Sequence, residues 1–335
     1  MLAKEILANR SGRYREHSDF FCTSKGIFGP RVAQVEIGQA ARALLQEHLN
    51  NHAVQVPGLI KRDLTPSSLW PDAASRLMYA YFGPVLLGPE TPEAVRGLVG
   101  QVVRQAVMAG ARDRLRGPAR VMFRGRVMRA LAAEIMARRS RGSNADILDI
   151  VARAAPDTAD PGQLAEVFLS FLFAVVGSVG FLVAWSVYLL GTSPSGPEVQ
   201  PLHIAREALR LWPVAWLFGR RPAVSHELGG IAVTPQHDVV VCSYLVQRHP
   251  AHWTEPDAFR PERWAGTVRS TAYLPFGWGR HSCVGAAIAL QFAELVISIL
   301  TTAYHLQVTQ CQDRAHIAAA LAPPQFTARL TPLPL

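Results

Sequence analysis

The chain has 335 residues, of which 49% are apolar and 18% charged, a composition that excludes a disordered or fibrous protein and predicts a large buried core. Its 34 Lys and Arg against 25 Asp and Glu give a net charge of +9. The four scattered cysteines exclude a disulfide framework and a Cys/His zinc site, and the first residues contain no signal peptide. We therefore expect a cytoplasmic protein in a reducing compartment.

The net charge lies in the first 150 residues, which hold 22 basic and 13 acidic residues against 12 of each in the remainder. Ten arginines fall between Arg112 and Arg141. Arginine-dense helices can bind nucleic acid, anionic membranes or acidic partners. Here the arginines alternate at helical spacing with apolar residues such as Val121 and Met122, and no nucleic-acid motif accompanies them. We interpret the stretch as a solvated helix face and expect no nucleic-acid partner.

Helical patterns separated by Gly and Pro turns predominate in the first 155 residues. They predict helices over Ala3–Asn9, Val35–Leu49, Pro71–Phe82, Pro92–Val107, Pro118–Arg139 and Ala145–Arg153. Further helices are predicted over Gln163–Leu190, His203–Trp212 and Val284–Ala303, and short strands over Ala223–His226, Ile231–Thr234 and Asp238–Ser243. The sequence thus predicts a mainly α protein with small β-sheets, in a single domain over residues 1–335.

The long helix contains an uncharged stretch, Val167–Pro197, that is long enough to cross a bilayer. The same pattern is typical of a helix buried on all sides in a large helical domain. No basic cluster flanks the stretch to set a membrane topology. This segment alone leaves both interpretations open.

A Gly-rich loop, Leu274–Gly285, carries the strongest chemical signal. Cys283 stands at its end, before an apolar helix, where backbone N–H groups, the helix dipole and the adjacent Arg280 and His281 would favour a thiolate. The glycines allow positive φ angles and a close approach to the backbone. A thiolate held in this way is suited to be an axial metal ligand.

The spacing Phe276-x-x-Gly279-x-x-x-Cys283-x-Gly285 resembles the heme-binding loop of the cytochrome P450 family. Two other family motifs precede it in the family's order: Glu207-x-x-Arg210, similar to the K-helix motif, and Phe259–Trp264, whose Arg263 would join that ion pair. The resemblance implies the cytochrome P450 fold, with heme b (iron-protoporphyrin IX) between the long I helix and the cysteine loop with its following L helix. The long apolar helix would then be buried in protein, with no membrane span.

By this resemblance, Cys283 would be the thiolate ligand of the heme iron, and His281 would pair with a heme propionate. Arg220 falls where the family commonly has another propionate-binding arginine, with Arg221 as the alternative. The remaining loop positions implied to contact the cofactor are Phe276, Gly277 and Gly285.

The distal helix departs from the family pattern. The family's I helix has an acid followed by a threonine, which hold water and deliver protons. Here the stretch reads Ala174-Val175-Val176-Gly177-Ser178, so Gly177 replaces the acid and Ser178 the threonine. Two explanations stay open. Proton delivery uses Ser178, ordered water and the substrate's own polar groups, or the enzyme uses peroxide or performs a redox-neutral rearrangement.

Two further positions depart from the family. Arg42 falls where the C helix has a propionate-binding arginine, but Gly38 replaces the Trp or His four residues earlier, so a solvated arginine is the alternative. The chain also begins near the family's B helix. The first helix and most of the first sheet have no counterpart, so the member is N-terminally shortened or the true start lies upstream of Met1.

These features favour a monooxygenase-type oxidoreductase of secondary metabolism that oxidises a small or medium apolar natural-product intermediate. We expect its electrons to come from a ferredoxin and a ferredoxin reductase, which would not dock on the stretch Arg112–Arg141. The alternative is a heme-deficient accessory protein that activates a partner enzyme. Retention of Cys283 with its whole loop speaks against that alternative.

Overall fold

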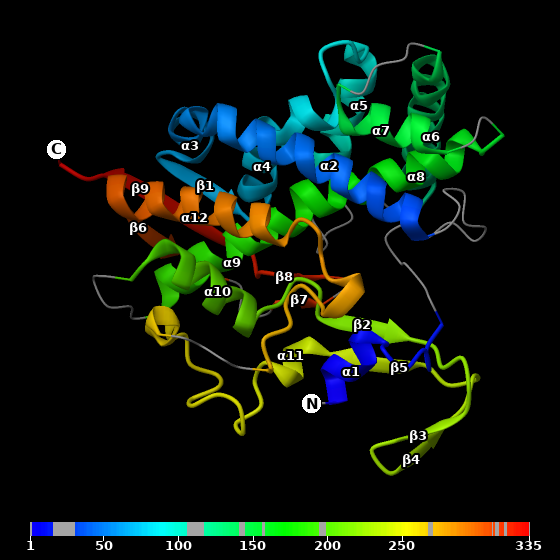
Figure 1. The fold of residues 1–335 in the computed structure, drawn as a ribbon. Helices are drawn as coiled ribbons and strands as arrows, with labels where there is room; N and C mark the ends of the chain where they lie inside the picture. The colour runs from blue at the N-terminus through cyan, green and yellow to red at the C-terminus, as the bar shows by residue number, and fades with distance from the viewer. Residues whose placement is uncertain are drawn as a thin grey trace.

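The computed structural model describes residues 2–15, 31–105, 117–140, 145–155, 158–193, 199–266, 271–309, 311, 315–317 and 320–334. A body of packed helices makes up most of the molecule, and most of the small sheets lie beside it (Figure 1). The helices are α1 Leu2–Ala8, α2 Arg31–His52, α3 Val56–Leu64, α4 Asp72–Leu86, α5 Glu93–Gln105, α6 Pro118–Arg139, α7 Ile147–Ala154, α8 Pro161–Leu172, α9 Val179–Thr192, α10 Pro201–Leu211, α11 Ser243–Val246 and α12 Ala286–Ala303. The prediction of a mainly α protein with small sheets is confirmed.

Helix α3 lies outside the predicted helices, and it contains Pro57 and Gly58, residues that disfavour a helix interior. The proline instead lies in the first turn of the helix, where its missing N–H leaves no hydrogen bond unmade. The buried side chains Val56, Ile60 and Leu64 then hold the helix against the core.

Within the described residues, the strands form four small antiparallel sheets. They are β1 Ser67–Trp70, β9 Phe326–Pro332 and β6 Tyr304–Thr309 in one sheet, β2 Leu217–Arg220 with β5 Val239–Cys242, β3 His226–Leu228 with β4 Ile231–Val233, and β7 His316–Ile317 with β8 Leu321–Ala322. The prediction of a strand over Ala223–His226 is wrong, since β3 begins at His226. Gly229 and Gly230 both have positive φ angles and close a tight hairpin, which pairs Leu228 with Ile231.

The long apolar helix runs through the core but is not one regular α-helix. The side chain of Asp160 caps its start at Pro161 by accepting bonds from the N–H groups of Gly162 and Gln163. Between α8 and α9, residues Phe173–Ser178 form a π-helical segment. The region Pro161–Thr192 is long and apolar enough for a membrane span, as is α12, but 67% of its most apolar window is buried within the protein. This burial agrees with a core helix.

Helix α6 carries most of the described part of the arginine-rich stretch, whose remainder lies outside the described residues. Arg120, Arg124, Arg126 and Arg129 are exposed, as predicted for a solvated face. Arg138 corrects that prediction, because only 3% of it is exposed. Its guanidinium bonds Glu134, Asp146, Asp149 and Thr91, which ties α6 to α7 and to the start of α5. A charge this deeply buried requires such partners.

Candidate functional site

The loop Leu274–Gly285 folds into consecutive tight turns before α12. Gly277 and Gly279 have φ angles of 71° and 76°, in the region that favours glycine. The N–H of Gly277 donates to the carbonyl of Leu274 at 3.2 Å, and the N–H of Cys283 donates to the carbonyl of Phe276 at 2.9 Å. These bonds fold the loop back on itself and place Cys283 beside the residue that begins the motif.

The thiol of Cys283 accepts hydrogen bonds from the N–H groups of Gly285 and Ala286, both of which lower its pKa. The protein atoms around the sulfur have the larger and opposite effect, because they partly desolvate it although the residue keeps an exposed side, and the pKa is raised overall. The N–H groups thus favour the thiolate as the sequence predicts, whereas desolvation, which the sequence did not indicate, disfavours the charged form. Helix α12 begins at Ala286, whose N–H has no partner within the helix and lies beside Cys283, to whose carbonyl it also donates at 3.4 Å.

This donor set fits a thiolate-ligated heme. A metal ligand must lose its proton, and the two N–H donors remain to stabilise the sulfur's charge once the metal replaces that proton. Cys283 and the following Val284 are exposed residues, so the open side of the loop is accessible to a flat ligand. A Cβ on Gly285 would lie 3.9 Å from the sulfur, so glycine here leaves the space beside the thiol open.

Strand β2 brings Arg220 to the same region. Phe218 and Arg220 lie on the same face of the strand, because alternate residues of a strand do so. The ring of Phe218 lies beside the loop, since a Cβ added to Gly277 would be 3.6 Å from it. Arg220 donates to the carbonyl of Leu7 at 3.4 Å. Arg221, the alternative, instead pairs with Asp238 at the surface. This geometry favours Arg220 over Arg221. His281 lies half-buried in a single 3₁₀ turn of the loop.

Helix α1 covers the outer side of the loop. A Cβ on Gly279 would lie 2.7 Å from the Cα of Ala8, so only glycine permits this approach. The ammonium of Lys4 lies 3.5 Å from the centre of the Trp278 ring. The end of α1 is closed by Asn9, whose side chain exchanges two hydrogen bonds with the backbone of Tyr14. The loop thus rests on α1 as well as on the helical body.

The predicted distal residues lie in the π-helical segment. Gly177 is buried and Ser178 is half-buried, at the end of the segment. Phe173, Ala174 and Ser178 are less buried than most of α9, whose side chains from Phe181 to Val187 are all buried. π-Helical turns inside α-helices frequently occur at functional sites. The departures from the family pattern at Gly177 and Ser178 are the one sequence feature that marks this segment. The spacing of apolar residues does not indicate a π-helical turn.

Arg42 lies on the exposed side of α2, in an open groove of about 450 Å³ that also includes Gln39 and Gln46. One turn earlier, a Cβ on Gly38 would lie 3.5 Å from the Val284 side chain, an ordinary contact. Helix α2 therefore meets the residue that follows Cys283. The assignment of Arg42 to a propionate stays a prediction.

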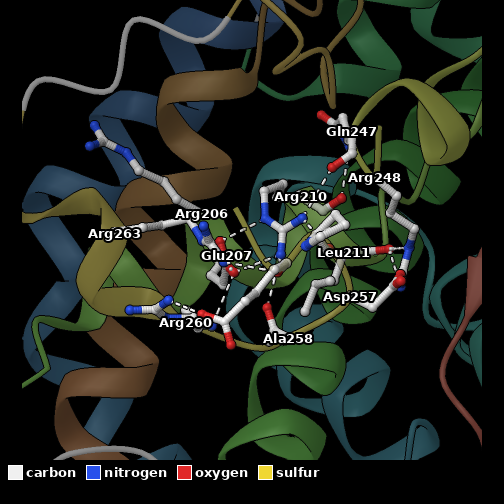
Figure 2. Close-up of polar contacts among 12 residues, drawn as sticks. Arg206, Glu207, Arg210, Leu211, Gln247, Arg248, Asp257, Ala258, Arg260 and Arg263 are labelled. Carbon is white, nitrogen blue, oxygen red and sulfur yellow. Dashed lines mark hydrogen bonds and ion pairs between the residues drawn. The ribbon is translucent and has the colours of Figure 1, made fainter. Parts of the chain in front are cut away.

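The predicted Glu–Arg–Arg network is present and fully buried at its centre (Figure 2). Glu207 and Arg210 are 0% exposed and make a two-point ion pair on α10, the shorter contact being 2.8 Å. Arg263 donates to Glu207 at 3.0 Å, and the indole of Trp264 donates to the same carboxylate at 2.9 Å. Arg210 also donates to the carbonyls of three residues: Gln247, Pro256 and Ala258.

Sequence reasoning missed Gln247, a fully buried side chain beside this network (Figure 2). Its Nε2 donates to the carbonyls of Leu209 and Arg210, and its Oε1 accepts from the N–H of Leu274 at 2.7 Å. A glutamine in a mixed polar segment carries no local signal of such a role. Only the fold brings it between the end of α10 and the start of the cysteine loop.

Comparison with known families gives a match of residues 203–326 to the cytochrome P450 family. Two curated relatives come from Streptomyces melanosporofaciens. Cyclooctatin synthase is 28% identical over 197 residues, 50% of this chain and 43% of the relative. Cyclooctat-9-en-7-ol 5-monooxygenase is 28% identical over 201 residues, 51% of this chain and 44% of the relative. The matched region thus spans less than half of the length of either relative.

Solved structures show the same fold over nearly the whole chain. The ligand-free structure of cytochrome P450 TbtJ1 aligns with a TM-score of 0.74 at 15% identity, covering 98% of this chain and 90% of that one. The structure of P450 OxyD, described as involved in the biosynthesis of vancomycin-type antibiotics, aligns with a TM-score of 0.72 at 19% identity and covers 90% of this chain and 77% of that one. At this identity the likeness concerns the fold.

Proposed function

The chain belongs to the cytochrome P450 family, and on that premise we propose that it is a heme-thiolate oxidoreductase that oxidises a small or medium apolar natural-product intermediate. The observation that carries the proposal is the Cys283 loop, with two N–H donors on the sulfur and an open side beside it. The relatives named above, one of them a monooxygenase by name, support an oxidation as the reaction.

In this proposal Cys283 holds the iron of heme b, and Arg220 and His281 hold its propionates. Phe276, Gly277 and Gly285 shape the space beside the sulfur. A thiolate-ligated heme supplies an iron centre with strong electron donation from sulfur, which favours cleavage of an O–O bond. The half-buried apolar side chains of the distal helix, such as Phe173, exclude bulk water and favour an apolar substrate.

Proton delivery is assigned to Ser178, whose hydroxyl lies at the end of the π-helical segment. With Gly177 at the position of the family's acid, ordered water and the substrate's own polar groups would complete the relay. Peroxide-driven or redox-neutral chemistry remains the alternative. An apolar substrate and a ferredoxin-type electron donor complete the proposal, together with a cytoplasmic location.

The test is the ferrous–CO difference spectrum of protein produced with an ample heme supply. We expect a red-shifted Soret band for the unaltered protein and for Cys311→Ser, since Cys311 is exposed and lies outside the loop. Cys283→Ser removes the sulfur and abolishes the red-shifted band. An unaltered protein that purifies without heme and gives no such band would overturn the proposal and favour a heme-deficient accessory protein.

A further inference from the structure

We infer that Gln247 is a positioning residue for Cys283: it fixes the cysteine loop to the buried Glu207–Arg210 pair. For the heme-bound state this inference rests on the proposed function. Gln247 follows α11 and is 0% exposed. Gln247 lies beside the ion-pair network on α10 (Figure 2) and also bonds the first residue of the loop.

On the α10 side, Gln247 is held by three hydrogen bonds. Its Nε2 donates to the carbonyl of Leu209 at 3.0 Å and to that of Arg210 at 3.2 Å. These carbonyls belong to the last turn of α10, where helix carbonyls lack intrahelical partners. In return, the Arg210 guanidinium donates to the backbone carbonyl of Gln247 at 3.1 Å. Any shift of this residue would therefore disturb a buried ion pair.

On the loop side, the Oε1 of Gln247 accepts from the N–H of Leu274 at 2.7 Å. Leu274 is itself 0% exposed, and its carbonyl accepts from Gly277. Phe276, two residues later, accepts the hydrogen bond from the N–H of Cys283. A continuous path of short hydrogen bonds and two peptide links thus joins the buried ion pair to the amide of the cysteine.

The chemistry of the position requires a primary amide. Two carbonyls need donors on one side, and one N–H needs an acceptor on the other. A carboxylate would place negative charge against two carbonyl oxygens, and an apolar side chain would leave three buried polar groups without partners. Such groups are costly to bury, so the loop would move to regain partners.

The experiment compares Gln247→Met, which keeps the length of the side chain, with Ile60→Ala as a control. Ile60 lies in the core on α3, which packs on α4 and β1, so its truncation destabilises the fold without touching the loop. Hydrogen–deuterium exchange is measured at the amides of Leu274 and Cys283, with and without heme. The second readout is the fraction of the ferrous–CO absorbance in the red-shifted band.

We expect Gln247→Met to speed exchange at Cys283 about tenfold, as the loss of about 1.4 kcal/mol of local stability would, and to reduce the red-shifted fraction. Gln247→Asn, which keeps the amide but shortens its reach, gives a smaller change in the same direction and serves if the Met variant fails to fold. Unchanged exchange and spectrum, or equal changes in Ile60→Ala, would overturn the inference. A protein without heme would refute the proposed function, while exchange at Cys283 would still decide the role of Gln247.

Discussion

At the scale of single residues, the distal site depends on which hydroxyl moves a proton. Ser178 ends the π-helical segment and is half-buried, whereas Ser186 on α9 is fully buried and donates to the carbonyl of Leu182 at 2.9 Å. A hydroxyl committed to a helix carbonyl cannot readily relay a proton. The two serines therefore form a matched pair on one helix.

Ser178→Ala should uncouple electron transfer from oxidation. We expect more hydrogen peroxide released per NADPH consumed, and a turnover that falls by about a hundredfold, the lower end of general acid–base contributions. The measurement uses a surrogate ferredoxin and its reductase, with Ser186→Ala as the control that keeps its coupling. Unaltered coupling in Ser178→Ala would remove the proton-relay role and favour peroxide-driven or redox-neutral chemistry.

The sequence located the chemical residues better than it described their surroundings. The spacing around Cys283 and the Glu207–Arg210 pair follow from local chain geometry, and both lie as the motifs predict. The raised pKa of the Cys283 thiol could not be predicted from the sequence, because the atoms that desolvate the sulfur come from segments distant in the chain. Gln247 was missed for the same reason.

At the scale of elements, α1 and the cysteine loop form one packed unit. Gly279 combines a positive φ angle with a close approach to Ala8. Gly266, by contrast, has an extended φ, and a Cβ added to it would meet no atom within 4 Å. Alanine substitutions at the two glycines can therefore be compared. Only the one at Gly279 adds an atom to the contact with α1.

Gly279→Ala should destabilise the protein by ~1–3 kcal/mol, because the added Cβ collides with α1 and alanine is strained at this φ. Urea unfolding measures the change in free energy, and transfer of heme to apomyoglobin measures retention of the cofactor, which should weaken. Gly266→Ala serves as the control with little effect. Equal unfolding free energies for the two variants would contradict a tight contact between α1 and the loop.

At the scale of the whole molecule, exposed arginines lie in two different places, on helix α6 and in the cysteine loop. Arg120, Arg126 and Arg129 lie on the exposed side of α6, a helix that packs against α5, α7 and α8. Arg280, by contrast, is exposed in the cysteine loop. Electron transfer to the proposed heme should depend on charge beside that loop, since docking charges act within about one Debye length, roughly 10 Å.

Reversal of Arg120, Arg126 and Arg129 to Glu should therefore leave the rate of reduction by a ferredoxin unchanged. Reversal of Arg280 alone should slow it, with a loss that salt diminishes. Stopped-flow reduction at two ionic strengths measures both. A large, salt-dependent loss in the α6 variant would place the docking surface on that helix instead.

The sequence by itself determined the helical class, the positions of most helices and the cysteine loop, because these depend on local periodicity and spacing. Only the tertiary structure decided the pairing of β1 with β9, which joins Trp70 to Phe326, and the burial of Arg138 among carboxylates. It also decided the π-helical turn and the place of Gln247. Each of these depends on contacts between distant segments, whose energies outweigh the weak preferences of short stretches.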